Sequence, residues 1–149
     1  MDSDKVYFSN NEVAWEFMPY KQVEDTTGVL SVLEYNQEFC FNVKRVFFLR
    51  DIKAGSNRGF HSHKELKQYL FCAQGHFEIE LDNGLEKRIY SLNKNSPGIF
   101  IDGKVWREMK FFSRDCVMMV LCDREYRFDE VVRDYDDFLA NIKKVENEL

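Results

Sequence analysis

The sequence predicts an all-β fold that ends in one short helix. Short β-rich segments separated by turn residues recur from residue 29 to residue 121, and only the last stretch spaces its apolar residues as a helix does. Several short strands at such intervals are typical of a sandwich or a barrel. A chain of 149 residues is most simply one domain, which can bury about two-thirds of its unfolded surface.

Turn signals divide the predicted strands from one another. Gln74-Gly75, Asp82-Asn83-Gly84 and Pro97-Gly98 are the clearest of these signals. The strands that we predict cover residues 29–33, 43–50, 68–73, 76–81, 88–92, the segment after Pro97-Gly98, 108–112 and 116–121. We place the core of one domain, residues 1–149, at about residues 20–135.

The C-terminal segment is predicted to be a helix over about residues 136–147. Acidic residues stand at its start and lysines near its end, which suits the helix dipole.

Two of the three histidines, His61 and His63, stand one residue apart. Side chains alternate between the two faces of a strand, so both imidazoles would project from the same face. Inside a small barrel they could ligate a metal or transfer protons near neutral pH. A purely structural pair, hydrogen-bonded within a polar barrel, is the alternative.

The spacing around this pair resembles the first motif of the cupin superfamily. Gly55, His61, His63, Gln68 and Gly75 follow one another at the intervals of that motif. The resemblance implies a cupin-type double-stranded β-helix, or jelly roll, with the two histidines facing its interior.

Two of the four ligands of a metal-binding cupin are missing. Gln68 stands where those cupins normally have Glu, and Trp106 or Arg107 stands where the last His is expected after the Pro97-Gly98 turn. Indole has no lone pair to donate, and guanidinium has no acceptor. Two histidines and a neutral amide are short of the three protein ligands of a typical catalytic zinc site. We therefore expect no catalytic metal.

Composition argues against several other classes of protein. The formal net charge is −5, so no basic excess favours nucleic-acid binding. No apolar run approaches about 18 residues, and the first residues lack the apolar core of a signal peptide, so no membrane association is expected. The four cysteines form no C-x-x-C pattern, and we expect buried, reduced thiols in a cytoplasmic protein (Cys40, Cys72, Cys116 and Cys122).

Five segments carry a closer resemblance. They are residues 58–64 (RGFHSHK), 81–84 (LDNG), 105–109 (VWREM), 112–121 (FSRDCVMMVL) and 132–138 (VRDYDDF). In this order they are similar to the cupin-type dTDP-sugar 3,4-ketoisomerases, also called WxcM-like proteins. The resemblance covers roughly residues 20–140.

The resemblance implies a substrate, dTDP-4-keto-6-deoxyglucose, and a product with the ketone at C3. A PLP-dependent aminotransferase would then aminate C3 on the way to a 3-amino-3,6-dideoxy sugar for a surface glycan such as lipopolysaccharide. The resemblance also implies a homodimer with exchanged N-terminal strands, and neither a metal nor an organic cofactor.

Moving the carbonyl requires a proton to leave C3 and a proton to reach C4 through an enediol. This needs a base that titrates near the working pH and a donor for the developing oxyanion. Imidazole, with a pKa near 6.5, suits the first task. In the family the second histidine of the pair is the expected base, which implies His63 here, while His61 would polarise the sugar oxygens or relay a proton.

The diphosphate needs cations, and resemblance and position nominate Arg45 and Arg58, with Lys64 as a further candidate. Guanidinium can donate two parallel hydrogen bonds to phosphate. The alternative is that these are surface cations on a solvated strand edge.

Three further residues complete the predicted substrate site. Gln68 is expected to contact the sugar or the base, and Trp106 to form a wall of the pocket. Arg107 replaces the histidine of some relatives by a fixed cation, which leaves the gluco or galacto configuration at C4 of the product open. His76, at the start of a strand, is expected at the rim. Residues 133–136 could be a lid, a dimer contact or a helix cap, and we prefer the cap.

Three other functions remain compatible with the sequence. A sugar-nucleotide 3,5-epimerase would exchange protons at C3 and C5 without moving the ketone. A metal-dependent cupin dioxygenase or isomerase would hold stoichiometric metal. A non-catalytic cupin would bind the sugar nucleotide and leave it unchanged.

Overall fold

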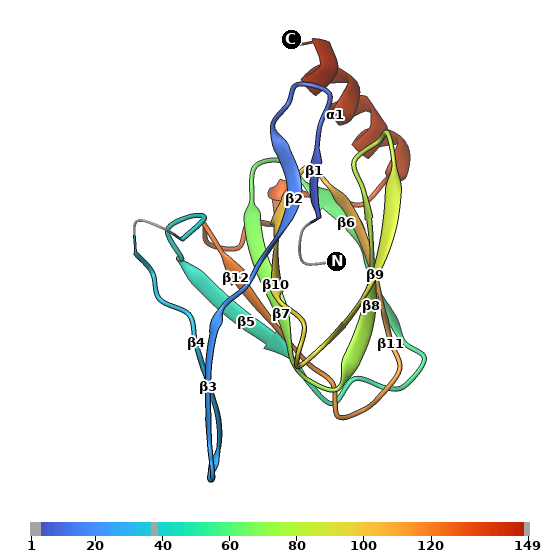
Figure 1. Ribbon diagram of the computed structural model, residues 1–149. Coiled ribbons are helices and arrows are strands. Elements are labelled where there is room, and N and C mark those ends of the chain that lie inside the picture. The colour runs from blue at the N-terminus through green and yellow to red at the C-terminus, as the bar shows by residue number, and fades with distance from the viewer. Residues whose placement is uncertain (1–3, 37–38, 148–149) are drawn as a thin grey trace.

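Two antiparallel β-sheets face each other, and one helix covers an end of the sandwich (Figure 1). This computed structural model describes residues 4–36 and 39–147. The six-stranded sheet has the order β1 (Lys5–Tyr7), β2 (Val13–Met18), β10 (Gly98–Asp102), β7 (Lys67–Gln74), β12 (Val117–Cys122) and β5 (Arg45–Leu49). The five-stranded sheet has the order β13 (Val131–Val132), β6 (Asn57–His63), β11 (Trp106–Phe111), β8 (His76–Asp82) and β9 (Lys87–Asn93).

Alternation along the strands builds the core between the sheets. On β8, Phe77, Ile79 and Leu81 are fully buried, while Glu78 and Glu80 between them are only partly buried. This period of two puts every second side chain of the strand into the sandwich. The predicted all-β jelly roll with a C-terminal helix is confirmed.

Helix α1 (Tyr135–Asn147) closes one end of the sandwich. Phe138 and Ile142 are buried, and the rings of Tyr135 and Phe138 pack on Trp106 with centroids 5.2 and 5.6 Å away. The Tyr135 hydroxyl donates to the buried Asp82 carboxylate over 2.6 Å. The short 3₁₀ turn η1 (Phe128–Glu130) and β13 lead into this helix and hold its start against β6.

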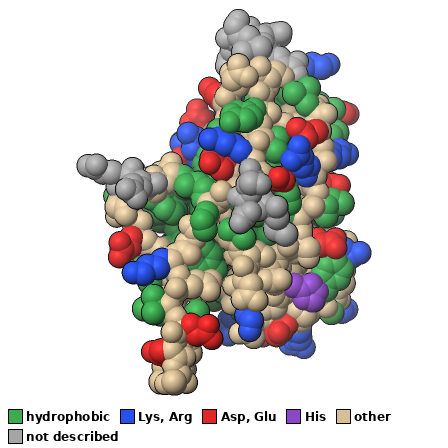
Figure 2. All heavy atoms as spheres, viewed as in Figure 1, with side chains coloured by type: hydrophobic (Ala, Val, Ile, Leu, Met, Phe, Trp, Pro, Cys, Tyr) green, Lys and Arg blue, Asp and Glu red, His purple; other side chains and the backbone are tan. Residues whose placement is uncertain are grey.

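A separate hairpin, which we call the arm, stands clear of the two sheets. It consists of β3 (Lys21–Asp25) and β4 (Gly28–Val32), which pair only with each other. Figure 2 shows the arm projecting from the body of the molecule. Val23, Val29 and Leu30 on the arm are 46%, 57% and 63% exposed.

The eight strands predicted from the sequence lie within two residues of observed strands. The expectation that the core begins near residue 20 is wrong, because β1 and β2 belong to the six-stranded sheet. The helix begins at Tyr135, and the capping interpretation is confirmed for Asp134, whose carboxylate accepts the backbone N–H of Asp137 over 3.0 Å.

All four thiols are free, and Cys72, Cys116 and Cys122 are buried as predicted, whereas Cys40 is only partly buried. Among the described residues, no helix is both long and apolar enough to cross a bilayer.

A β-bulge interrupts β6 just before the histidine pair. His61 lies opposite Arg107 and Gly59 lies opposite Glu108, so Phe60 has no partner on β11. Phe60 has φ 57° and Gly59 has φ 95°, both in the left-handed region. The extra residue shifts the alternation, so Arg58 lies opposite the inward-facing Met109. The bulge therefore brings Arg58 and His61 to the same face, although they are three residues apart.

We predict that Gly59→Ala destabilises the fold far more than Gly55→Ala. Both glycines have positive φ, but a Cβ on Gly59 would lie 2.8 Å from the Arg107 carbonyl oxygen, whereas a Cβ on Gly55 meets nothing within 4 Å. The shared backbone strain costs about 1 kcal/mol. The clash should add about 2 kcal/mol or more to the loss for Gly59→Ala. Denaturant unfolding measures both variants, and equal losses would contradict the close packing of the bulge.

Candidate active site

A cavity of about 520 Å³ opens between the two sheets. Its described lining combines apolar residues of β5, β7 and β12 with polar residues of β6, β7, β11 and the segment after β13. The polar residues are Asn57, Arg58, His61, Gln68, Arg107 and Arg133. No aspartate or glutamate is among the described residues that line it. The cavity therefore offers cations and imidazole to a ligand, which favours an anionic one.

The two histidines lie at different depths. His61 lines the cavity, whereas His63 is 7% exposed and does not line it. Their rings are 4.8 Å apart and nearly perpendicular. His63 ends β6, where its backbone N–H donates to the Gly103 carbonyl over 2.7 Å. The two imidazoles lie side by side, as predicted, but of the two only His61 lines the cavity.

Arg107 and Gln68 join the two sheets at the bottom of the cavity. The guanidinium of Arg107, on β11, donates to the Gln68 side-chain oxygen, on β7, over 2.5 Å. It also donates to the backbone carbonyls of Asp102, Gly103 and Val105 over 3.0–3.2 Å. Arg107 is only 2% exposed, and its Nε has no hydrogen-bond partner.

Burial, together with the charge of Arg107, holds the imidazoles neutral. Burial lowers the pKa of Arg107 to about 10, so the guanidinium stays charged at neutral pH. Burial and the Arg107 charge lower the pKa of His61 to about 4, opposed by a hydrogen bond with the Gly59 backbone. The same two causes, joined by His61, Arg45 and Arg133, lower the pKa of His63 to about 2. A neutral imidazole is the form that accepts a proton. The expectation of a base that titrates near the working pH is not met, because burial and the Arg107 charge put the pKa of both histidines well below neutral pH.

The side chains present do not form a metal site of the cupin type. Among residues 4–36 and 39–147, no three His, Cys, Asp or Glu side chains are grouped as metal ligands. Gln68 and Arg107, at the sequence positions where a metal-binding cupin would have Glu and His, form a hydrogen bond with each other instead. The fixed charge of Arg107 would also repel a divalent cation next to the histidines.

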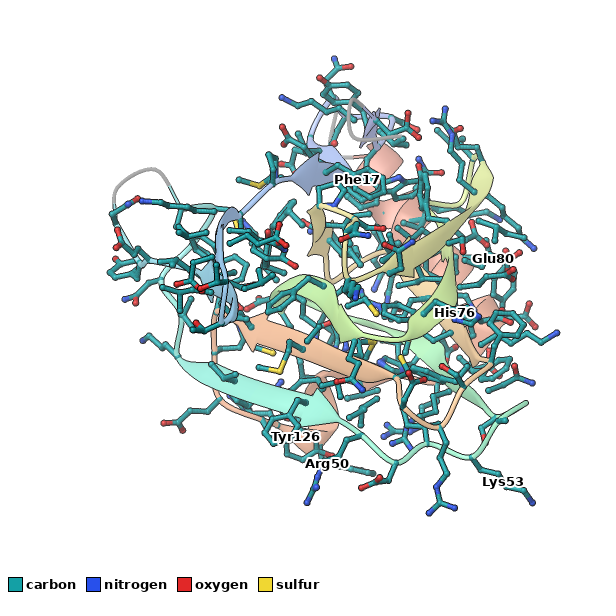
Figure 3. All side chains as sticks on the ribbon, turned by 60° about the horizontal axis from the view of Figure 1, so that its bottom comes forward. Phe17, Arg50, Lys53, His76, Glu80 and Tyr126 are labelled. Atoms are coloured by element: carbon teal, nitrogen blue, oxygen red, sulfur yellow. The ribbon has the colours of Figure 1, made fainter. Side chains whose placement is uncertain are left out.

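Arg45 lies deeper than a solvated strand edge. Its guanidinium lies over the rings of Phe47 and Tyr126, 5.5 and 5.6 Å from their centroids, and donates to the Cys122 sulfur over 3.3 Å. Figure 3 shows Tyr126 beside β5. Arg45 is part of the charge around His63 but does not line the cavity.

Two nominated residues lie away from the cavity. Lys64 is exposed in the turn after β6 and does not line it. Trp106, expected in the pocket wall, instead packs under α1, and its indole N–H donates to Glu108 over 3.1 Å. Trp106 faces away from the cavity because side chains alternate along a strand and the next residue, Arg107, faces into the cavity. His76 is exposed, stacks on Phe112 and does not line the cavity.

Arg133 is the charged residue of the described cavity lining that the sequence interpretation did not nominate for the substrate site. It lies in the segment 133–136, for which a lid, a dimer contact and a helix cap were considered and the cap was preferred. The pairing of β13 with β6, which brings Arg133 beside the histidines, involves only two residues on β13. So short a strand leaves no period-2 pattern that could have been detected.

The comparisons with known proteins agree with this geometry. The family model FdtA, described as WxcM-like, C-terminal, matches residues 13–143. The TDP-4-oxo-6-deoxy-alpha-D-glucose-3,4-oxoisomerase of Aneurinibacillus thermoaerophilus is 38% identical over 126 residues, which are 85% of this chain and 91% of that protein.

Solved structures give the same result. The sugar 3,4-ketoisomerase QdtA from Thermoanaerobacterium thermosaccharolyticum, in complex with TDP, superposes with a TM-score of 0.84 at 34% identity, over 89% of this chain and 96% of that one. The RmlC epimerase of Mycobacterium tuberculosis, at 16% identity and a TM-score of 0.68 over 79% of this chain and 67% of that one, shares the fold alone. The chain therefore belongs to the WxcM-like (FdtA) family of dTDP-sugar 3,4-ketoisomerases.

Proposed function

We propose that this protein converts dTDP-4-keto-6-deoxyglucose to the corresponding 3-keto sugar. The observation that carries the proposal is a neutral imidazole, His61, on the wall of a cavity lined by three arginines and, within the described residues, by no carboxylate. A structure of a histidine-to-asparagine mutant of QdtA contains TDP-4-keto-6-deoxyglucose, at 34% identity to this chain and a TM-score of 0.83. Aminotransfer to the C3 ketone of the product would follow in the biosynthesis of a 3-amino-3,6-dideoxy sugar.

We propose that His61, and not His63, contacts the sugar, because His61 lines the cavity and His63 does not. His61 removes the C3 proton, which the neighbouring C4 ketone acidifies, while O4 gains a proton. The resulting enediol then loses the proton of O3 as C4 is protonated, and the ketone has moved to C3. The ring of His63 lies 4.8 Å from that of His61, but neither of its ring nitrogens has a hydrogen-bond partner among the described residues, so we assign no proton-transfer step to it. No electron leaves the sugar, so the reaction requires no redox cofactor.

The cations have separate tasks in this proposal. Arg107 lies directly opposite His61 in the pairing of β6 with β11, and its charge favours the oxyanion that develops at O3 or O4. Its partner Gln68 fixes the guanidinium and faces the same space. Arg58, which is exposed at the cavity, is placed for the diphosphate.

Proton NMR in D₂O tests the reaction. Metal-free wild-type protein should convert dTDP-4-keto-6-deoxyglucose to a 3-keto sugar with deuterium at C4, and the C4 coupling assigns the gluco or galacto product. His61→Asn should slow conversion by about 10²-fold or more, because the proton-transfer group is lost. His76→Asn, at an exposed imidazole stacked on Phe112, should leave the rate unchanged.

Three results of this experiment would contradict the proposal. Deuterium at C3 and C5 with the ketone still at C4 would indicate a 3,5-epimerase. Binding without exchange would indicate a non-catalytic cupin. Conversion that depends on added metal would indicate a metal-dependent cupin. His63→Asn in the same series decides which histidine is essential.

We also propose that two copies form a homodimer through the arm. A two-stranded hairpin is marginally stable alone, so the arm needs a surface to cover its exposed valines and leucine. The edge strand β5 offers such a surface, with Val46 and Phe48 54% and 55% exposed. Arm exchange between two copies would cover both patches at once.

Replacing residues 21–32 by a two-glycine turn should convert a dimer to a monomer in light scattering. Phe48→Ser, on the proposed receiving strand, should weaken the dimer while the arm is intact. Ile89→Ser is the matched control, because Ile89 is 64% exposed on β9 in the other sheet. A monomeric wild type, or a dimer that survives loss of the arm, would contradict this proposal.

A cytoplasmic location is consistent with the four free thiols and with a nucleotide-linked substrate.

A further inference from the structure

We propose that Arg133 binds the diphosphate of the sugar nucleotide at the mouth of the cavity. This inference rests on the proposed function, since it assigns a part of the substrate to a residue to which the sequence analysis gave no role in binding. It gives the segment between β13 and α1 a role in binding in addition to capping the helix.

The strand register directs Arg133 into the cavity. Val131 pairs with His63 and Val132 pairs with Ser62, so the next step of this antiparallel ladder reaches the level of His61. Val132 pairs with Ser62, so its buried side chain lies on the face of Ser62. Side chains alternate along a strand, so Arg133 lies on the face of His61 and lines the same cavity.

The backbone that carries Arg133 is tied to the end of β6. A Glu130 carboxylate oxygen accepts the backbone N–H groups of Glu65 and Leu66, each over 2.6 Å. The Glu130 carbonyl accepts the N–H of Lys64 over 3.0 Å. The turn that follows the histidines therefore positions Arg133 before any ligand arrives, which reduces the entropy lost on binding.

The guanidinium of Arg133 is held by a ring instead of a carboxylate. It lies over Phe128, 5.6 Å from the ring centroid. Within the described residues it forms no ion pair, whereas Arg124 and Arg127 on the same segment pair with Asp123 and Asp129. A cation–π contact orients the side chain and leaves its N–H donors available to an anion.

Arg133 and Arg107 lie at different depths in the cavity. Arg107 is buried and engaged with Gln68 and three carbonyls, beside the position of the reacting carbons. Arg133 and Arg58 are both exposed side chains of the cavity lining, which places them where a charged, hydrated group enters. A diphosphate diester carries two negative charges, and two guanidinium groups match them.

The test compares TDP affinity, kcat and KM for variants of the whole protein. Arg133→Gln should raise the Kd for TDP and the KM for the sugar nucleotide by roughly 10- to 100-fold, as expected for the loss of a charge-assisted contact. Its kcat should change little, and its TDP affinity should depend less steeply on salt. Arg133→Lys should recover part of the affinity, because a point charge remains.

Arg127→Gln is the control, since it removes an arginine that pairs with Asp129 on the same exposed segment. Its affinity for TDP should equal that of the wild type. Phe128→Leu should weaken TDP binding by a few-fold, because the ring no longer orients the guanidinium.

An Arg133→Gln variant with wild-type TDP affinity would overturn the inference. So would a loss confined to kcat, which would put Arg133 at the sugar. A wild type that neither binds TDP nor converts the sugar nucleotide would instead refute the proposed function, so the two failures are distinguishable. Thermal unfolding of each variant checks that its fold is intact.

Discussion

The buried pair of Arg107 and Gln68 determines the chemistry of this cavity. Arg107 is 2% exposed, and within the described residues its guanidinium donates to four neutral oxygens, so it puts a positive charge between the sheets. The buried Asp102 carboxylate is the main opposing charge that acts on it. The positive charge of Arg107 disfavours protonated His61 and His63 and would repel a divalent cation. It attracts an anionic ligand and would stabilise an oxyanion beside the imidazole. Burial of the two imidazoles and the charge of Arg107 together keep them neutral, and the same charge favours an anionic ligand.

The fold supports this pair from both sides. Gln68 belongs to the six-stranded sheet and Arg107 to the five-stranded sheet, so their hydrogen bond crosses the sandwich. The bulge at Phe60 then brings Arg58 onto the face of His61, and β13 adds Arg133 from the start of the helical segment. The cavity therefore collects its cations from three places that are distant in the sequence.

Much of this arrangement could be predicted from the sequence, and the exceptions have physical causes. Turn residues and period-2 patterns located eight strands, and the H-x-H spacing with Gln68 located the cavity. Trp106 was misplaced because the choice between inward Trp106 and inward Arg107 depends on strand register, which composition does not encode. The position of Arg133 in the cavity lining depends on the two-residue strand β13, which is too short to be recognised in the sequence.

The protonation state of the histidines tests the central claim most directly. We would follow the imidazole nitrogen resonances of ¹⁵N-labelled protein by NMR from pH 8 to pH 5, assigned with His76→Gln, and repeat the titration with Arg107→Gln. The account predicts that His61 and His63 stay neutral throughout this range in the wild type, and that loss of the guanidinium raises the pKa of both. If either histidine gained its proton at pH 6.5 or above in the wild type, the buried cation would not control the site.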